Sequence, residues 1–376
     1  MPLERTVKMQ LVKELSQAGV NRREICRRYA VAPKTAYKYL EQYNAGGEAA
    51  LEARSTRPHN SPAKLDEATE QRILELHEEL RWGPRKLRHR LQTLGWPRVP
   101  AKSTIELVLK RNGRVSEERS RKSRPYQRFE HEQPNDLWQM DFKGHFALHS
   151  GERCHPLLVL DDHSRYLLAL RACSNERRET VQPILIELFR EKGLPVRMLM
   201  DNGPPWGRAG VRVYSQLEVW LIRLDVRVSH GRAHHPQTQG KVERMNRTVP
   251  DEMPLDFEDL AAAERGFGIY LPRYNEERPH ESLDMQVPAS RYRPSERMYP
   301  EQLPAVEYDE GDQVRRVQKG GWISYRGREW RIGRAFEGER VAVKPGSEEG
   351  RMLVYYCRQR LLELDPRQAA SAGECV

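Results

Sequence analysis

The chain has 376 residues, a length that favours two or three domains rather than one. Its 64 Lys and Arg residues exceed its 54 Asp and Glu residues, which gives a net charge of +10 and an isoelectric point near 9.4. Such a surplus indicates a polyanionic partner, although ribosomal, membrane-surface and merely basic soluble proteins share it. Nowhere do about eighteen apolar residues follow one another, which excludes a chain built on membrane-spanning helices.

The five cysteines are scattered, odd in number and without a Cys-x-x-Cys pair. Free thiols in a reducing cytoplasm are therefore favoured over a disulfide framework. The first residues also lack the apolar core of a secretory signal. We expect a cytoplasmic protein that does not enter a membrane.

Residues 1–50 are predicted to form a helix-turn-helix domain. Apolar spacing between residues 8 and 44 gives three short helices, with a tight turn at residues 31–33 (VAP) before the third. A plain three-helix bundle with a solvated basic face is the alternative. On the outer side of the third helix lie the side chains that suit base edges and phosphates in a major groove, namely Lys34, Thr35, Tyr37 and Lys38.

A second helix-turn-helix-like DNA-binding domain is predicted for residues 62–113, after a linker rich in Pro, Ser and Asn. Apolar residues recur there at helical spacing, and Pro84 suits the first turn of the middle helix. A single basic helix is more often only a solvated face, but two tandem units favour DNA binding. The residues of this helix that we expect to meet phosphates are Arg85, Lys86 and Arg88. Residues 114–130 are predicted to be a basic linker.

Residues 131–298 are predicted to form a mixed α/β core. Three antiparallel strands come first, and helices then alternate with further strands, which is the order that an RNase H-like sheet requires. The strands are expected near residues 137–142, 156–160, 166–172, 196–200 and 226–228, and the helices near 178–192 and 213–224.

Residues 305–365 are predicted to form a small all-β, SH3-like barrel, because short strand candidates alternate there with turns that contain Gly. The fold class predicted for the whole chain is therefore multidomain. It combines N-terminal all-α helix-turn-helix units, a central α/β RNase H-like core with a mixed sheet, and this C-terminal all-β domain.

Three acids stand out in the core. Asp141 and Asp201 each close a short apolar run of strand character, whereas Glu243 lies in a polar stretch that indicates a helix start. Folded together, they would supply the oxygen ligands that hard divalent cations prefer. Two such ions can drive an in-line phosphoryl displacement, which predicts a two-metal nuclease or strand-transfer site. The alternative is that each is an ordinary strand-end or helix-start carboxylate.

With their flanking residues, these acids resemble the integrase-core (DDE) transposases of bacterial insertion sequences, which are relatives of retroviral integrases. The resemblance covers about residues 130 to 295. The motifs that carry it, in chain order, are residues 138–142 (WQMDF), 160–165 (LDDHSR), 201–204 (DNGP), 234–247 (HHPQTQGKVERMNR) and 274–280 (YNEERPH).

The resemblance implies that Asp141, Asp201 and Glu243 are a catalytic triad that binds two Mg²⁺ ions, which Mn²⁺ can replace. It implies cleavage of DNA by water and then attack of the freed 3′-hydroxyl on target DNA, without a covalent protein–DNA intermediate. The implied partners are double-stranded DNA, as element terminal inverted repeats and as target, and further copies of the chain in a synaptic complex. A cytoplasmic, nucleoid-associated enzyme is expected. The polar residues near the triad that we expect to contact DNA are Gln237, Gln239, Lys241, Arg244 and Arg247.

Two departures from the family pattern stand out. The 41 residues between Asp201 and Glu243 exceed the common interval, and we assign the excess to a loop at residues 206–213. Pro250 replaces a basic residue seven positions after Glu243 and is predicted to end or kink the helix. A DNA transposase is the function predicted. The alternatives are a catalytically inactive, transposase-derived DNA-binding regulator and a metal-dependent nuclease without strand transfer.

Overall fold

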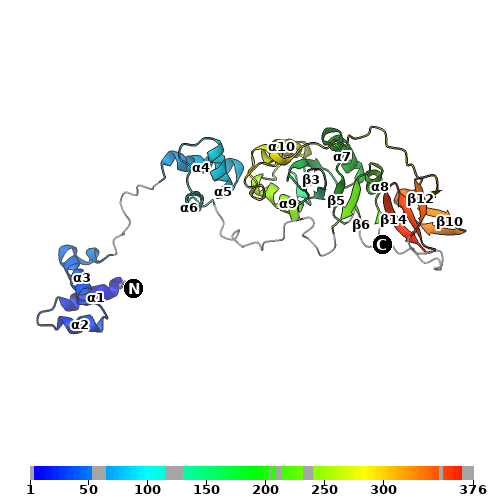
Figure 1. Ribbon diagram of the computed structural model, residues 1–376. Helices are drawn as coiled ribbons and strands as arrows, with labels where there is room; N and C mark the ends of the chain where they lie inside the picture. Colours follow the sequence, from blue (N-terminus) through cyan, green and yellow to red (C-terminus); the bar gives the residue numbers. More distant parts are fainter. Residues whose placement is uncertain are drawn as a thin grey trace. The chain divides into compact units, whose positions relative to one another are not determined.

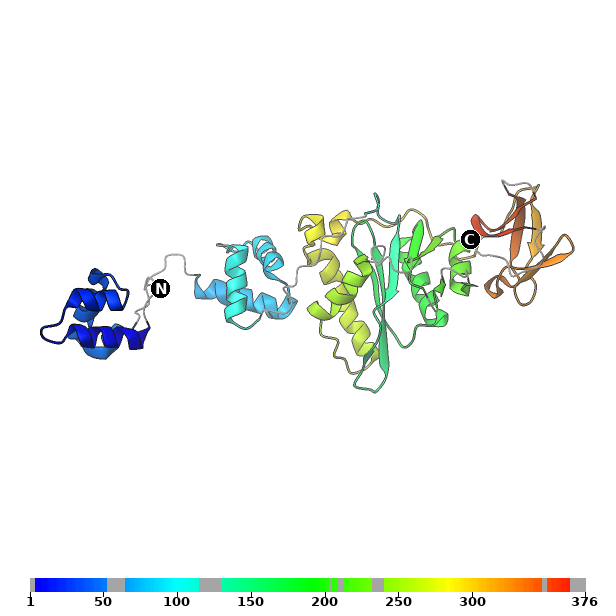
Figure 2. The same ribbon diagram turned by 90° about the horizontal axis from the view of Figure 1, so that it is seen from below.

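The computed structural model describes residues 4–52, 65–114, 130–202, 205–208, 213–231, 240–346 and 350–365 (Figures 1 and 2). The chain divides into two compact units, Met1–Lys64 and Leu65–Val376. Nearly all of the predicted basic linker lies outside the described residues. No helix within the described ranges is both long enough and apolar enough to cross a membrane.

The first unit contains the three predicted helices. They are α1 (Arg5–Leu15), α2 (Arg22–Arg28) and α3 (Pro33–Gly46), followed by the 3-10 turn η1 (Gly47–Leu51). Asn21 caps α2, because its side chain accepts a hydrogen bond from the backbone of Glu24. Leucine, isoleucine and alanine side chains from the three helices form a small separate core.

The second unit begins with α4 (Glu67–Leu80), α5 (Pro84–Thr93) and α6 (Lys102–Arg111). Pro84 occupies the first turn of α5, as predicted, where its missing N–H costs no hydrogen bond. The three helices enclose their own apolar core around Trp82, which is 1% exposed.

A mixed sheet follows, as the sequence predicted. Its strands are β1 (Trp138–Phe142), β2 (Phe146–Ala147), β3 (Arg153–Asp161), β4 (Leu167–Cys173), β5 (Arg197–Met200) and β8 (Arg227–His230). β3 pairs antiparallel with both β1 and β4, whereas β5 pairs parallel with β1 and with β8. The order across the sheet is thus β4, β3, β1, β5, β8, with β2 paired to the start of β3.

Helices cover both faces of this sheet. On β3, Leu157 and Val159 join an apolar cluster with α7 (Arg178–Lys192) and α8 (Gln216–Arg223). Leu158 and Leu160 face the opposite way and join a cluster with α9 (Gly240–Glu252) and α10 (Leu260–Pro272). This alternation is expected because successive side chains of a strand point to opposite faces of the sheet. Figure 2 shows the two helical layers on either side of the strands.

The segment after Trp206 differs from the prediction. The expected loop contains two short strands, β6 (Gly207–Arg208) and β7 (Val213–Tyr214), which pair antiparallel, and the helix expected from residue 213 begins at Gln216.

Pro250 lies in the last turn of α9, which ends at Glu252. Because proline has no N–H, the helical hydrogen bond to the carbonyl oxygen four residues earlier is missing there.

After α10 the chain forms a π-helical turn, η4 (Arg273–Glu277), and the 3-10 turns η5 (Glu281–Leu283) and η6 (Pro288–Arg291). The β-rich end then comprises β9 (Gln313–Arg316), β10 (Trp322–Tyr325), β11 (Arg328–Arg331), the turn η7 (Arg334–Phe336), β12 (Arg340–Pro345), β13 (Met352–Tyr356) and β14 (Gln359–Leu364).

The β-rich end is all-β, as predicted, but its described strands do not close into one barrel. β14, β13, β12 and β9 form a four-stranded antiparallel sheet, while β10 and β11 form a separate ribbon. The ribbon joins the same apolar core, because Ile323 and Tyr325 pack with Val341 and Val354 of the larger sheet. β14 was not predicted from the sequence.

Candidate active site

Asp141 lies near the end of β1, in the middle of the sheet. The Nδ2 atom of Asn246, on α9, donates a hydrogen bond of 2.8 Å to its Oδ2 atom. Burial raises the pKa of Asp141 to about 6, and the negative charges of Asp201 and Glu243 add to this rise against the hydrogen bond from Asn246. Asp201 and Glu243 are therefore each close enough to Asp141 to affect it electrostatically.

Asp201 immediately follows β5. In the parallel pairing of β1 and β5, Trp138 lies opposite Met198 and Gln139 opposite Leu199. Continuing this register puts Asp201 beside Asp141, which agrees with the prediction that the two acids occupy neighbouring strands. The carboxylate of Asp201 is exposed and accepts a hydrogen bond of 2.7 Å from the backbone N–H of Asn202.

The turn at Asp201 is held from β8 and α8. A nitrogen of the His230 ring lies 3.0 Å from the carbonyl oxygen of Asp201, and its other nitrogen lies 2.8 Å from the Glu218 carboxylate. The side chain of Asn202 donates to the carbonyl oxygen of Gly231 at 2.8 Å. Glu218 is only 3% exposed, so this support comes from a buried group. Sequence reasoning missed both His230 and Glu218.

Glu243 lies in the first turn of α9, and its side chain is exposed. Two contacts fix the start of this helix. The backbone N–H of Val242 donates to Oε1 of Gln139 at 3.3 Å, and the ammonium group of Lys241 lies 2.5 Å from the carboxylate of Asp162.

Asp162 links β1, the strand of Asp141, to α9, the helix of Glu243. Its side chain is almost completely buried and accepts a hydrogen bond of 2.7 Å from Nε2 of Gln139, two residues before Asp141. The same carboxylate pairs with Lys241, two residues before Glu243. The motif at residues 160–165 could have revealed this role, because it contains two adjacent acids at the end of a predicted strand.

Within the described part of the chain, no three His, Cys, Asp or Glu side chains are arranged to hold a metal ion as they stand. The donor types nevertheless fit a hard divalent cation, since all three predicted ligands are carboxylates. The assignment of the triad stays a prediction.

The residues predicted to contact DNA differ in their exposure and in their ion pairs. On α3, the side chains of Lys34, Thr35, Tyr37 and Lys38 are all exposed, while Ala36 between them is buried. This matches the predicted outer face of the helix. Contact of these residues with DNA stays a prediction.

On α5, the three predicted residues differ from one another. Arg88 is exposed, but Arg85 and Lys86 form ion pairs with Glu281 and Glu252, at 3.3 and 2.9 Å. On α9, Arg244 and Arg247 are exposed, whereas Lys241 pairs with Asp162. Gln237 and Gln239 lie outside the described residues.

Models of known families match the chain in several parts. Residues 312–371 match the C-terminal domain of IS481 family transposases, and residues 131–236 and 224–288 match two integrase core domain models. Residues 7–59 match a helix-turn-helix domain, and residues 35–109 match a homeodomain-like domain.

Among similar proteins is an uncharacterized 31.7 kDa protein of the insertion element IS407 from Burkholderia multivorans. It is 27% identical over 237 residues, which are 61% of this chain and 82% of that protein. A Pol polyprotein of feline endogenous virus ECE1 is 31% identical over 124 residues, or 32% of this chain. The chain spans only 11% of that polyprotein and 10% of the Gag-Pol polyprotein of avian reticuloendotheliosis virus, which it also matches.

Similar solved structures are viral. A chain of the simian T-cell lymphotropic virus intasome, in complex with PP2A regulatory subunit B56 gamma, is matched over its full length and over 78% of this chain, with a TM-score of 0.35 and 16% identity. The HTLV-2 integrase catalytic core domain in complex with magnesium is matched over 99% of its length and 43% of this chain, with a TM-score of 0.32 and 16% identity.

Proposed function

We propose that this chain, an integrase-core transposase of a bacterial insertion sequence, binds the ends of its element, cleaves the DNA there and joins the freed 3′-hydroxyl ends to target DNA. The observation that carries the proposal is the parallel pairing of β1 with β5, whose register leads to neighbouring positions for Asp141 and Asp201, with Glu243 near enough for its charge to affect Asp141. A polynucleotidyl transferase needs such an acidic centre, whereas a DNA-binding regulator does not.

Asp141, Asp201 and Glu243 would hold two Mg²⁺ ions, which Mn²⁺ would replace. When bound, such ions supply charge stabilisation for the attacking and leaving oxygens of an in-line displacement. The buried Oδ1 atom of Asn246 has no hydrogen-bond partner among the described residues, although it lies on the side chain that contacts Asp141. It can accept a hydrogen bond from the water shell of a cation, which supports a hydrated ion at this place.

The rest of the chain supports catalysis on DNA. Asn246 holds Asp141, His230 holds the turn of Asp201, and Asp162 aligns β1 with the start of α9. The exposed Arg244 and Arg247 lie on the same helix as Glu243, where they would contact the phosphates of the bound strand. The basic surplus of the chain adds a salt-sensitive contribution to DNA affinity.

DNA recognition falls to the helical units, with α3 reading element ends through Lys34, Thr35, Tyr37 and Lys38. The β-rich end, for which the sequence predicts an SH3-like barrel, would add non-specific or assembly contacts. Because two element ends must be processed together, the active species would be a homo-oligomer.

The test is a cleavage and joining assay on labelled DNA that carries the element termini, with Mg²⁺ or Mn²⁺. Each of Asp141→Asn, Asp201→Asn and Glu243→Gln should abolish cleavage and leave end binding nearly unchanged. Glu179→Gln is the matched control, since that exposed acid lies on α7, against the opposite face of the sheet. Nicks without joined products would favour the nuclease, and binding without any metal-dependent product would favour the regulator.

A further inference from the structure

The basic face of α5 meets the catalytic core rather than open solvent. Three cations of this helix pair with three acids of the core. Arg85 lies 3.3 Å from Glu281, Lys86 lies 2.9 Å from Glu252, and the third pair joins Arg90 to Glu277 at 2.6 Å.

A fourth contact runs in the opposite direction. Arg273, in the π-helical turn of the core, lies 3.8 Å from the carboxylate of Glu79 and donates to the carbonyl oxygen of the same residue at 3.4 Å. The paired charges therefore lie on α4 and α5 of the helical unit and on α9, η4 and η5 of the core. Isolated surface ion pairs contribute little, but a set that shares one interface constrains its geometry.

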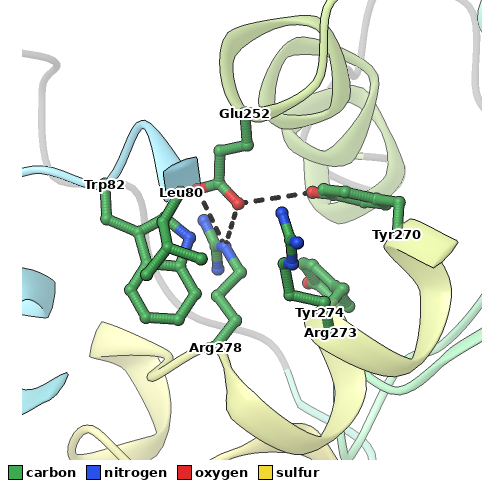
Figure 3. Close-up of a pocket in the computed structure, with 7 residues that line it drawn as sticks. All are labelled: Leu80, Trp82, Glu252, Tyr270, Arg273, Tyr274 and Arg278. Atoms are coloured by element: carbon green, nitrogen blue, oxygen red, sulfur yellow. Dashed lines mark hydrogen bonds and ion pairs between the residues drawn. The ribbon is translucent and has the colours of Figure 1, made fainter. Parts of the chain in front are cut away.

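Glu252 is the centre of this interface (Figure 3). Both of its carboxylate oxygens accept hydrogen bonds from Nε of Arg278, at 2.9 and 2.7 Å, and the hydroxyl of Tyr270 lies 3.3 Å from one of them. The side chains of Glu252 and Arg278 are 7% and 8% exposed. Lys86 completes this cluster from the helical unit.

Apolar side chains close the same pocket. Leu80 and Trp82 of the helical unit line it together with Tyr270 and Tyr274 of the core (Figure 3). The packed side chains leave no space there for a water molecule. A buried charge is tolerated only when it is paired and its hydrogen bonds are satisfied. Glu252 is thus paired from both sides, by Arg278 of the core and by Lys86 of the helical unit.

The charge states agree with this arrangement. Burial alone would raise the pKa of Glu252, but the charges and hydrogen bonds of Arg278 and Lys86 outweigh it and lower the pKa. Burial, helped by the charge of Arg278, lowers the pKa of Lys86 against the opposing effects of Glu252 and Glu281. The side chain of Lys86 is 15% exposed, so its ammonium group is largely withdrawn from bulk water and faces Glu252.

We propose that α5 is a docking element that holds the second helical unit on the catalytic core of the same chain, with Glu252 as its anchor. Arg85, Lys86 and Arg90 then serve this interface, and the DNA-contacting surface of the unit lies elsewhere. Docking would fix DNA bound by this unit relative to the three acids. That last consequence rests on the proposed function, but the docking itself does not.

The docking can be tested by hydrogen–deuterium exchange of the full chain without DNA. Arg90→Glu and Glu277→Arg should each raise exchange several-fold in the segments around residues 80–90 and 270–281, because each places like charges together. The double variant exchanges the two charges and should restore protection. Arg88→Glu is the matched control, because Arg88 is an exposed arginine of the same helix.

Unchanged exchange in both single variants would overturn the proposal. So would protection that falls on dilution, because that result would place the interface between copies of the chain. Rescue by the double variant separates loss of docking from misfolding, which exchanged charges would not repair.

The salt dependence of DNA binding supplies a second test. Each phosphate contact contributes about 0.9 to the slope of log affinity against log salt concentration. Lys86→Ala and Arg90→Ala should leave this slope unchanged, and a decrease of about that size would assign these residues to DNA instead. If exchange shows no docking but the cleavage and joining assay succeeds, only the docking proposal has failed. If docking is present but no metal-dependent product forms, only the proposed function has failed.

Discussion

The side-chain amide of Asn246 connects Asp141 on β1 to α9, the helix that carries Glu243. Asn246 donates its hydrogen bond to Asp141 from one turn beyond Glu243, so it orients a predicted ligand without being a ligand itself. Loss of a partner that orients a metal ligand typically costs about 10–100-fold in metal affinity or activity.

Asn246→Ala should therefore lower the cleavage rate by about 10–100-fold and raise the Mg²⁺ concentration needed for half-maximal activity. End binding should change little. Titration of cleavage against Mg²⁺ measures the effect, with Thr248→Ala on the same helix as the control. An unchanged Mg²⁺ dependence would show that Asn246 does not position the metal site.

His230 has the same kind of role for Asp201, but through the backbone. Its ring contacts the carbonyl oxygen of Asp201 and is held by the buried Glu218. His230→Ala should lower cleavage by about 10-fold or more, because the turn loses its support and Glu218 loses a partner. His230→Gln, which keeps a hydrogen-bond donor, should recover part of the rate. Equal rates for the two variants would contradict this role.

At the scale of elements, β1 and α9 must keep a fixed relative position if Asp141 and Glu243 are to act in one site. The buried carboxylate of Asp162 does this through Gln139 and Lys241. The two contacts span 23 and 79 residues of the chain, so together they join Gln139 to Lys241.

Asp162→Ala should reduce the free energy of unfolding by about 2–4 kcal/mol, because it leaves buried partners unpaired. Urea unfolding measures this loss. Asp256→Asn, in an exposed loop, should change stability by less than about 0.5 kcal/mol. If Asp162→Ala unfolds with the same free energy as the wild type, Asp162 does not hold β1 and α9 together.

Much of the core could be predicted at this scale. The runs that became β1, β3, β4 and β5 are apolar and end at polar residues, so strand type and the neighbouring positions of Asp141 and Asp201 followed from pattern. β14 was missed because residues 359–364 (QRLLEL) lack strict alternation and have the composition of a helix. Its strand form depends on pairing with β13, which no local signal reveals.

The interface of α5 could not be predicted for a similar reason. Local sequence shows a basic helix, which is compatible with DNA, solvent or an acidic protein surface. In the structure, Lys86 of this helix pairs with Glu252, which lies 166 residues further along the chain. The pairing therefore depends on tertiary packing. His230, Glu218 and Asn246 were missed because their roles are likewise defined by contacts between elements.

At the scale of the whole molecule, residues Met1–Lys64 form a compact unit separate from Leu65–Val376. Removal of residues 1–64 should leave the melting temperature of the remainder nearly unchanged, because the first unit has its own small core. Preference for element ends over unrelated DNA should fall, since each lost base contact costs about 1–3 kcal/mol. Competition binding with the two DNAs measures the preference, and an undiminished preference would assign end recognition to the second unit.

The proposed activity depends on the acidic centre that Asp141, Asp201 and Glu243 are predicted to form. The measurement that tests it most directly is cleavage and joining of labelled element-end DNA in Mg²⁺ by the wild-type chain and by Asp201→Asn. We predict joined products with the wild type and neither nicks nor joined products with the variant, at similar end binding. Joined products at the same rate from Asp201→Asn would contradict the assignment of the active site.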